Sequence, residues 1–278
     1  MKKLTTLLFV LVFASTMAFA QSNEATVDQE GDNQDSYVEQ VGSTNEADVD
    51  QFTNNSGAQE SDVLQFGTGN IATVSQSQTG GGDNFLNSAY IEQNGNSNEA
   101  TQTQNAPSSN SGQSVWGLQD GSENTLSQST GSGYTLSLTA EQYGSSNIAT
   151  QDASGSHNQG EVYQDGESNE ADQNLSGSNN GYMGDIILID QNGIGNYASQ
   201  DFTGHGSSHS NNAEVIQLGD DNEAWQLGNG RNLNATVSQE GMGNWSNQEQ
   251  WGNGHSSSVT QTGDNNTADV MQSSGGGI

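Results

Sequence analysis

The sequence repeats the motif Q-x-G-x-x-N ten times, and successive copies begin 22 to 28 residues apart. A motif that keeps its internal spacing while recurring at such an interval is typical of solenoids and other repeat arrays. In these proteins each unit contacts mainly its neighbours, so no single compact core forms. The Gln and Asn residues that open and close the ten copies are Gln40, Asn45, Gln65, Asn70, Gln93, Asn98, Gln119, Asn124, Gln142, Asn147, Gln164, Asn169, Gln191, Asn196, Gln217, Asn222, Gln239, Asn244, Gln261 and Asn266.

The residues around the motif alternate with a period of two, which is the side-chain period of a β-strand. Val or Ile stands two positions before the Gln in eight copies, as at Val38, and Ala stands two positions after the Asn in eight copies, as at Ala47. We therefore expect one strand to end near the Gln and a second to begin near the Asn. The Gly between them suits a bend that needs positive φ or a close approach of two backbones. These expected turn glycines are Gly42, Gly67, Gly95, Gly121, Gly144, Gly166, Gly193, Gly219, Gly241 and Gly263.

An isolated rung, meaning one strand–turn–strand unit, is not expected to be stable. Burying its Val or Ile side chain contributes ~1.5–3 kcal/mol, whereas fixing about twenty residues costs ~1–2 kcal/mol each in backbone entropy. Rungs that stack about 4.8 Å apart bring equivalent Gln and Asn side chains into amide hydrogen-bond ladders. The predicted fold class is therefore all-β, a β-solenoid of stacked strand–turn–strand repeats that becomes cross-β on polymerisation. The copy at Gln119 has Gly117 in place of Val or Ile, so its rung is expected to be weak.

The first twenty residues have the pattern of a secretory signal peptide. Two lysines precede an apolar run from Leu4 to Phe13, and Ala18-Phe19-Ala20 ends the segment. We expect residues 1–20 to be removed on export. Residues 21–278 are then expected to form the repeat domain, with about ten full repeats after a leading half repeat. The mature chain is predicted to pass through the periplasm and to act outside the cell.

The charge and the cysteine count exclude some classes of partner and of stabilising bond. Removal of residues 1–20 would leave Arg231 alone against 34 acidic residues. Nucleic acid is therefore excluded as a partner, because its phosphates would be repelled. The chain has no Cys, so no disulfide can stabilise the exported fold. Its stability must come from stacked backbone and side-chain ladders.

Residues that could support catalysis or bind a metal are scarce and scattered. Of the four His residues, only His205 and His209 have a spacing that suggests a metal site, and flexible polar loop residues are the simpler interpretation. The many carboxylates form no calcium-binding loop motif. We predict no catalytic residue, no metal and no cofactor, and hence that the chain is not an enzyme. The four residues are His157, His205, His209 and His255.

The extended pattern A-x-V-x-Q-x-G-x-x-N-x-A, found in full from Ala213 to Ala224, resembles the curlin repeat. Curlins are the subunits of curli, the extracellular functional amyloid fibres of bacterial biofilms. The resemblance implies stacked rungs in which the opening Gln and closing Asn of each motif form the stacking ladder. It also implies export of the unfolded chain through a curli-type secretion pore with periplasmic chaperones, and nucleated polymerisation with a companion curlin subunit.

Two departures from the curlin pattern leave the type of subunit open. The repeat face begins at Asn23, where the major curli subunit normally has a Gly-rich export segment, and the repeats are about twice as many as usual. The chain is therefore expected to be either a major subunit or a minor, nucleating one.

The repeat pattern continues to Gln272 with no polar capping repeat at either end. Because exposed β edges pair with other chains, we expect head-to-tail fibres of identical copies.

The predicted function is that of a secreted structural subunit of curli-like amyloid fibres on the cell surface. Such fibres would serve biofilm matrix and surface adhesion, with cell-surface or matrix polysaccharide as a further partner. The alternative is a monomeric β-solenoid adhesin or glycan-binding module, and a solenoid hydrolase is more distant because the inward positions are mostly Gln, Asn, Ala and Val.

Overall fold

The computed structural model describes residues 22–54, 57–79, 86–106, 112–182, 185–205 and 210–274. The predicted signal peptide and His209 lie outside the described residues. All secondary structure elements within the described ranges are β-strands.

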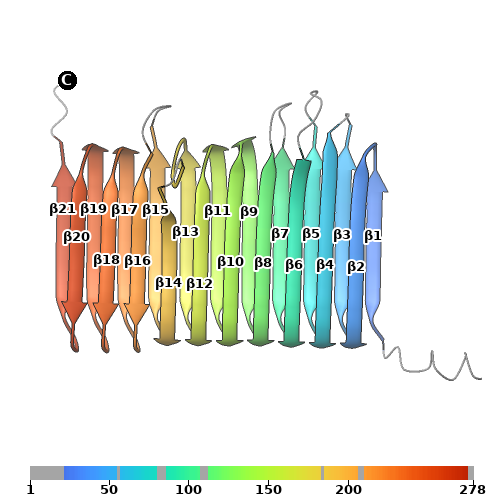
Figure 1. The fold of residues 1–278 in the computed structure, drawn as a ribbon, viewed down its shortest axis with the longest axis horizontal. Helices are drawn as coiled ribbons and strands as arrows, with labels where there is room; N and C mark the ends of the chain where they lie inside the picture. The colour runs from blue at the N-terminus through green and yellow to red at the C-terminus, as the bar shows by residue number, and fades with distance from the viewer. Residues whose placement is uncertain are drawn as a thin grey trace, which may run out of the picture.

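The strands form two parallel sheets, and consecutive strands of the chain alternate between them (Figure 1). Sheet A contains β2 (Gln34–Ser43), β4 (Ala58–Thr68), β6 (Leu86–Asn96), β8 (Gln113–Ser122), β10 (Leu136–Ser145), β12 (Gln159–Glu167), β14 (Ile187–Ile194), β16 (Asn212–Leu218), β18 (Asn234–Glu240) and β20 (Ser256–Thr262). Sheet B contains β1 (Glu24–Glu30), β3 (Glu46–Thr53), β5 (Ile71–Gln78), β7 (Glu99–Ala106), β9 (Thr125–Tyr134), β11 (Ile148–Ser156), β13 (Glu170–Gly177), β15 (Tyr197–Gly204), β17 (Glu223–Arg231), β19 (Trp245–Asn253) and β21 (Thr267–Ser273).

Each strand pairs with the strand two places further along the chain, and equivalent motif residues face one another. Gln40 is paired with Gln65 in sheet A, and Ala47 is paired with Ala72 in sheet B. This register repeats from the blue end of the molecule at β1 to the red end at β21 (Figure 1). The predicted all-β fold, a β-solenoid of stacked rungs, is confirmed. Cross-β structure on polymerisation stays a prediction.

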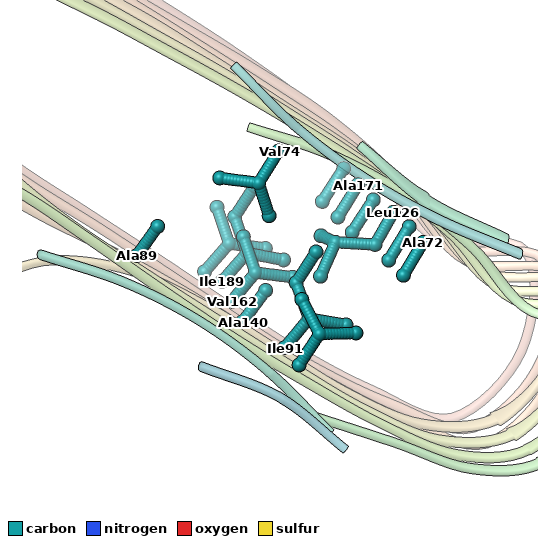
Figure 2. Close-up of a cluster of buried hydrophobic side chains, with 14 of the residues drawn as sticks. Ala72, Val74, Ala89, Ile91, Leu126, Ala140, Val162, Ala171 and Ile189 are labelled. Atoms are coloured by element: carbon teal, nitrogen blue, oxygen red, sulfur yellow. The ribbon is translucent and has the colours of Figure 1, made fainter. Parts of the chain in front are cut away.

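The core is a narrow layer between the two sheets, as Figure 2 shows in a view along the stack. Buried and solvent-facing side chains alternate along the inner strands, so Val74 from sheet B and Ile91, Val162 and Ile189 from sheet A point inward and are fully buried. The same inward columns carry many buried Gln and Asn side chains. A core of this composition holds only if its amides are hydrogen-bonded, because an unpaired buried amide costs about 1–3 kcal/mol.

The rung at Gln119, which was expected to be weak, has a compensating side chain on the facing sheet, and its stability stays a prediction. Leu126 stands in the column that carries Ala100 and Ala149 in the neighbouring rungs, and its side chain is buried. A Cβ placed on Gly117 would lie 2.5 Å from Leu126 Cδ2, so the Leu fills the space that the Gly leaves. The side-chain volume that Gly117 lacks in sheet A is thus supplied by Leu126 in sheet B. The repeat pattern did not predict this compensation, because it compares residues along one strand and not across the two facing sheets.

Candidate functional site

The opening Gln of each motif belongs to one continuous ladder along the inner face of sheet A. The Nε2 of each Gln donates to the Oε1 of the Gln in the next rung, at 2.8–2.9 Å along the whole column. Each Nε2 also donates to a backbone carbonyl of sheet B, as from Gln93 to Ile71 at 2.9 Å. Both amide hydrogens are therefore used, and every bond of the ladder points toward the C-terminal end.

The closing Asn of each motif forms a second ladder of opposite polarity at the bend. The backbone N–H of Asn196 donates to Oδ1 of Asn169 at 3.1 Å, and its Nδ2 donates to the same oxygen at 3.0 Å. The Nδ2 of Asn169 in turn donates to the carbonyl of Gly193 in the following rung at 2.9 Å. The Asn therefore links its own bend to the bend before it and to the bend after it.

The motif Gly adopts a backbone conformation that other residues rarely reach. Its φ lies between 99° and 141° in all ten copies. From Gly42 to Gly241, a Cβ at this position would collide with the carbonyl oxygen of the motif Gly in the next rung. The Gly is required both by its φ and by the close stacking of the bends.

A second position of the bend has positive φ that the sequence analysis did not identify. The residue just before each motif Asn has φ between 55° and 69°. This is the left-handed region, which costs roughly 1–2 kcal/mol for a residue with a side chain. The position was missed because its chemistry varies: the residues are Thr44, Gly69, Ser97, Glu123, Ser146, Ser168, Gly195, Asp221, Gly243 and Asn265.

The opposite edge of the solenoid uses a related bend in some rungs. Gly155 and His157 have φ of 95° and 58° and precede Asn158, so the spacing G-x-x-N is the same as in the motif. The Nδ2 of Asn180 donates to Oδ1 of Asn158 at 3.1 Å, which begins a short Asn ladder on this edge. The signal was available in the sequence as Gly155–Asn158 and Gly177–Asn180, spaced 22 residues apart.

Sheet B carries its own Gln ladders, and these change column along the stack. The long central ladder runs from Gln102 to Gln248 with Nε2-to-Oε1 distances of 2.8–2.9 Å. Near the N-terminal end a separate ladder runs from Gln29 to Gln104, in a column that lies two positions further along each strand. Gln250 and Gln272 occupy that same column at the C-terminal end. The Oε1 atoms of Gln102 and Gln250 are buried without a hydrogen-bond partner. Each of these atoms is the first acceptor of a ladder, so no Gln before it supplies a donor.

The histidines that the structure describes make separate contacts. The ring of His157 lies 4.5 Å from that of Tyr182, the His205 ring lies 3.0 Å from Asn229 Oδ1, and His255 Nε2 lies 3.0 Å from the Trp251 carbonyl. Among the described residues, no three His, Cys, Asp or Glu side chains are grouped closely enough to hold a metal ion. No described helix is long and apolar enough to span a membrane.

The perturbed ionisable groups lie on the outer faces of the sheets. Partial burial raises the pKa of Asp172, Asp190 and Asp201 above the ordinary value of an Asp, and for Asp172 and Asp190 nearby carboxylates add to the effect. A hydrogen bond to Glu141, followed by burial, raises the pKa of Tyr143 to about 12. The Asp pKa shifts follow first from partial burial and the Tyr143 pKa shift first from its hydrogen bond, and they do not define a reactive centre.

The ends of the stack are chemically complementary. In the motif ladder of sheet A, within the described chain, no Gln precedes Gln40 and none follows Gln261, whose Nε2 donates only to the Trp245 carbonyl. For the Gln ladder, one end therefore presents an acceptor and the other presents a donor. The edge strands β1 and β2 lie at one end, and β20 and β21 lie at the other.

These observations define a parallel β-solenoid whose rungs are joined by Gln and Asn ladders. Residues 20–52 match the family model of the curlin associated repeat. The matched segment covers β1, β2 and most of β3, including the first motif copy, so the resemblance to the curlin repeat is confirmed there. No curated protein matches the chain.

Proposed function

We propose that this chain is a secreted structural subunit of curli-like extracellular amyloid fibres and not an enzyme. Copies join head to tail when the end strands of one copy pair with those of the next. The observation that carries the proposal is the polarity of the motif Gln ladder, because Gln261 at one end presents the donor that Gln40 at the other end lacks. Open parallel edges of this kind bind further strands.

The proposal extends to the route and the setting of assembly. Export through a curli-type pore with periplasmic chaperones fits the predicted signal peptide and the curlin associated repeat. The 34 acidic residues would keep the exported monomer soluble and slow its nucleation, and they disfavour nucleic acid as a partner. Fibres at the cell surface would then contribute to biofilm matrix and adhesion.

The direct test is to purify residues 21–278 and follow thioflavin fluorescence and fibre diffraction with time. We expect a lag phase, fibres, and a meridional reflection near about 4.8 Å. A chain that is folded from the start and stays monomeric at high concentration for days would refute the proposal. Adding trace amounts to a companion curlin subunit tests the type of subunit, since a nucleator shortens the partner's lag phase at such amounts.

A matched pair of variants tests whether the end strand is the growing surface. Val259 in β20 points inward and is buried, whereas its neighbour Thr260 is exposed. Val259→Glu places a charge in the face that must receive the next copy, and we expect it to stop elongation. Thr260→Glu adds the same charge on the outside and is expected to elongate. Circular dichroism of the two monomers checks that both remain folded.

An aromatic hollow on the outer face of sheet B supports a second candidate function, glycan binding. The rings of Tyr197 and Trp225 lie 4.9 Å apart, and Trp225 and Trp245 line a hollow of ≈ 450 Å³ together with Glu223 and Glu249. Aromatic faces beside polar groups suit a sugar ring. This candidate would be favoured if the monomer bound matrix polysaccharide and Trp225→Ala abolished that binding.

A further inference from the structure

The two sheets end differently, and this affects how copies can join. Sheet A ends at β2 and β20, whereas sheet B ends at β1 and β21 and contains one more strand in the described chain. Each strand pairs with the strand two places further on. If the next copy continues this rule, its β2 pairs with β20 and its β3 pairs with β21. The place on β3 that β21 would take is already occupied by β1 of that copy.

We infer that β21 of one copy replaces β1 on β3 of the next copy, so that the joint is a strand exchange. This inference rests on the proposed head-to-tail assembly and specifies its contact surface. Both sheets then continue across the joint without a break. The displaced segment, residues 24–30, is released at the fibre surface.

The inward side chains of β21 match those of the strand it would replace. β1 presents Ala25, Val27 and Gln29 to the core, and they pair with Ala47, Val49 and Gln51 of β3. β21 presents the same three residue types at the same spacing, Ala268, Val270 and Gln272. Most sheet B strands between β7 and β19 carry their ladder Gln two positions earlier. The end strand β21 is thus suited to β3 and not to the middle of the stack.

The sheet A strands at the joint match as well. β20 presents Ser257, Val259 and Gln261 to the core, and β2 presents Ser36, Val38 and Gln40. Aligning them lets Nε2 of Gln261 donate to Oε1 of Gln40, which continues the polarity of the ladder.

The closing Asn ladder also continues across the proposed joint. In the monomer, Oδ1 of Asn23 accepts the backbone N–H of Asn45 at 3.1 Å. When β21 replaces β1, Oδ1 of Asn266 from the other copy stands in the place of Asn23 and can accept the same N–H.

Charge makes β1 the strand that is easiest to displace. Among the registered pairs of the described strands, acid faces acid at Glu24–Glu46, Asp28–Asp50 and Asp35–Glu60, and the first two lie between β1 and β3. Like charges directly opposite are destabilising. With β21 in place, the same positions of β3 face Thr267 and Met271, and one acid pair, Asp269 with Asp48, replaces two.

Burial supports the same conclusion. Every residue of β1 is exposed, whereas alternate residues of β21, at the other end of sheet B, are half-buried. Val27 is 46% exposed although it points toward the core. β1 therefore covers the end of the stack loosely, as an exchangeable strand would.

If β1 stayed in place instead, β21 would pair with β1 of the next copy. Sheet A would then lack one strand between β20 and β2 at every joint, which leaves two rows of backbone groups unpaired beside the core. The two acid pairs between β1 and β3 would also remain. This arrangement is the competing outcome of the test.

The two joints differ in length and in neighbours, so they can be told apart. With strand exchange a subunit spans ten rungs of both sheets, or about 48 Å, and without it eleven rungs, or about 53 Å. Electron microscopy of fibres grown from a chain with a small tag at its C-terminus measures this repeat. A repeat of about 48 Å is expected, and about 53 Å would overturn the inference.

Cysteine pairs give a second, independent readout, because the chain has no Cys of its own. Asp269, Asp48 and Thr26 are exposed on the outer face of sheet B. Strand exchange places Asp269 beside Asp48 of the next copy, within the Cα separation of about 4.4–6.8 Å that a disulfide needs. Thr26 then lies on the released segment and is no longer registered with any strand. Fibres from mixed D269C and D48C chains, one of them tagged, should therefore form heterodimers on oxidation. Fibres from D269C with T26C should form far fewer, because a released segment holds Thr26 at no fixed place beside Asp269.

The controls separate this inference from the proposed function. D269C mixed with D152C, in the middle of the stack, measures random crosslinking between fibres. Fibres that crosslink through T26C and not through D48C would overturn strand exchange while leaving the fibre function intact. If no variant and no parent chain forms fibres, the proposed function itself fails.

Discussion

The Nδ2 atom of Asn169 donates to the backbone carbonyl of Gly193 at 2.9 Å. This bond joins the closing Asn of one motif to the bend Gly of the next motif. Asn169 also accepts from the N–H and the Nδ2 of Asn196. Its Nδ2 also donates to Oδ1 of Asn147 in the preceding bend at 3.1 Å, so one buried amide connects three successive bends. The motif spacing Q-x-G-x-x-N is fixed because Gln, Gly and Asn must all reach their counterparts in the next rung.

Replacing this Asn by the isosteric Asp should be strongly destabilising. Asn169→Asp removes the donor to Gly193, and burial leaves the new carboxylate without solvent. We expect the unfolding free energy to fall by about 3 kcal/mol or more. Asn105→Asp makes the same change at an exposed position and should stay within about 0.5 kcal/mol. Urea unfolding of the two monomers compares them, and equal midpoints would contradict the role of the bond.

The two positive-φ positions of one bend should respond in opposite directions. Gly193→Ala puts a Cβ against the Gly219 carbonyl at φ 138°, which should cost about 3 kcal/mol or more. Ser168→Gly relieves a left-handed Ser at φ 59° and should gain about 1 kcal/mol. Thermal unfolding measures both. A tolerated alanine would mean that the bends do not stack as closely as the structure shows.

The pair Gly117 and Leu126 predicts a strong coupling in a double-mutant cycle. Gly117→Val alone overpacks the core, and Leu126→Ala alone leaves a cavity, with an expected loss of about 2–5 kcal/mol for the latter. The double variant restores the Val and Ala of the common pattern and should recover about 1–3 kcal/mol of the summed losses. Additive losses would show that Leu126 does not fill the space above Gly117.

The position of a Gln within its ladder should decide what its loss costs. Gln151→Val, in the middle of the central ladder, leaves the Oε1 of Gln173 without its donor and removes the acceptor of Gln128. Gln102→Val, at the start, only moves the existing unpartnered acceptor one rung further on. We expect the first variant to be less stable than the second by about 1–3 kcal/mol. Denaturant midpoints of the two variants check the order.

Acidification should stabilise the folded chain. Burial raises the pKa of Asp172, Asp190 and Asp201, so the folded chain holds their protons more tightly than the unfolded chain does. Stability must then increase as the pH falls through the folded pKa values, and the gain is complete below the ordinary Asp value. Asp172→Asn should raise stability at neutral pH and reduce this pH dependence. Asp185→Asn, which removes an exposed charge before β14, should do neither.

The repeat period and the alternation of inward and outward residues predicted most of the fold. The alternation around Val38, Gln40 and Ala47 predicted two strands per rung, and the Gly of each motif marked the bend between them, because inward and outward positions differ strongly in polarity. The left-handed position before each Asn could not be predicted from the sequence, since Ser, Thr, Glu and Asp all occur there. Stacking of the bends compensates for the backbone strain at this position. Compensation between Leu126 and Gly117 was also hidden, because the two residues lie on facing sheets.

The sequence by itself therefore determined the rung: its strands, its bend and the amides that must pair between copies of the motif. Those features depend on local period and on residue chemistry, which repeat along the chain. Only the tertiary structure decided which Gln columns run together, where they change column, and how the two ends of the stack differ. These depend on which strand of one sheet faces which strand of the other, and that arrangement exists only once the rungs have stacked.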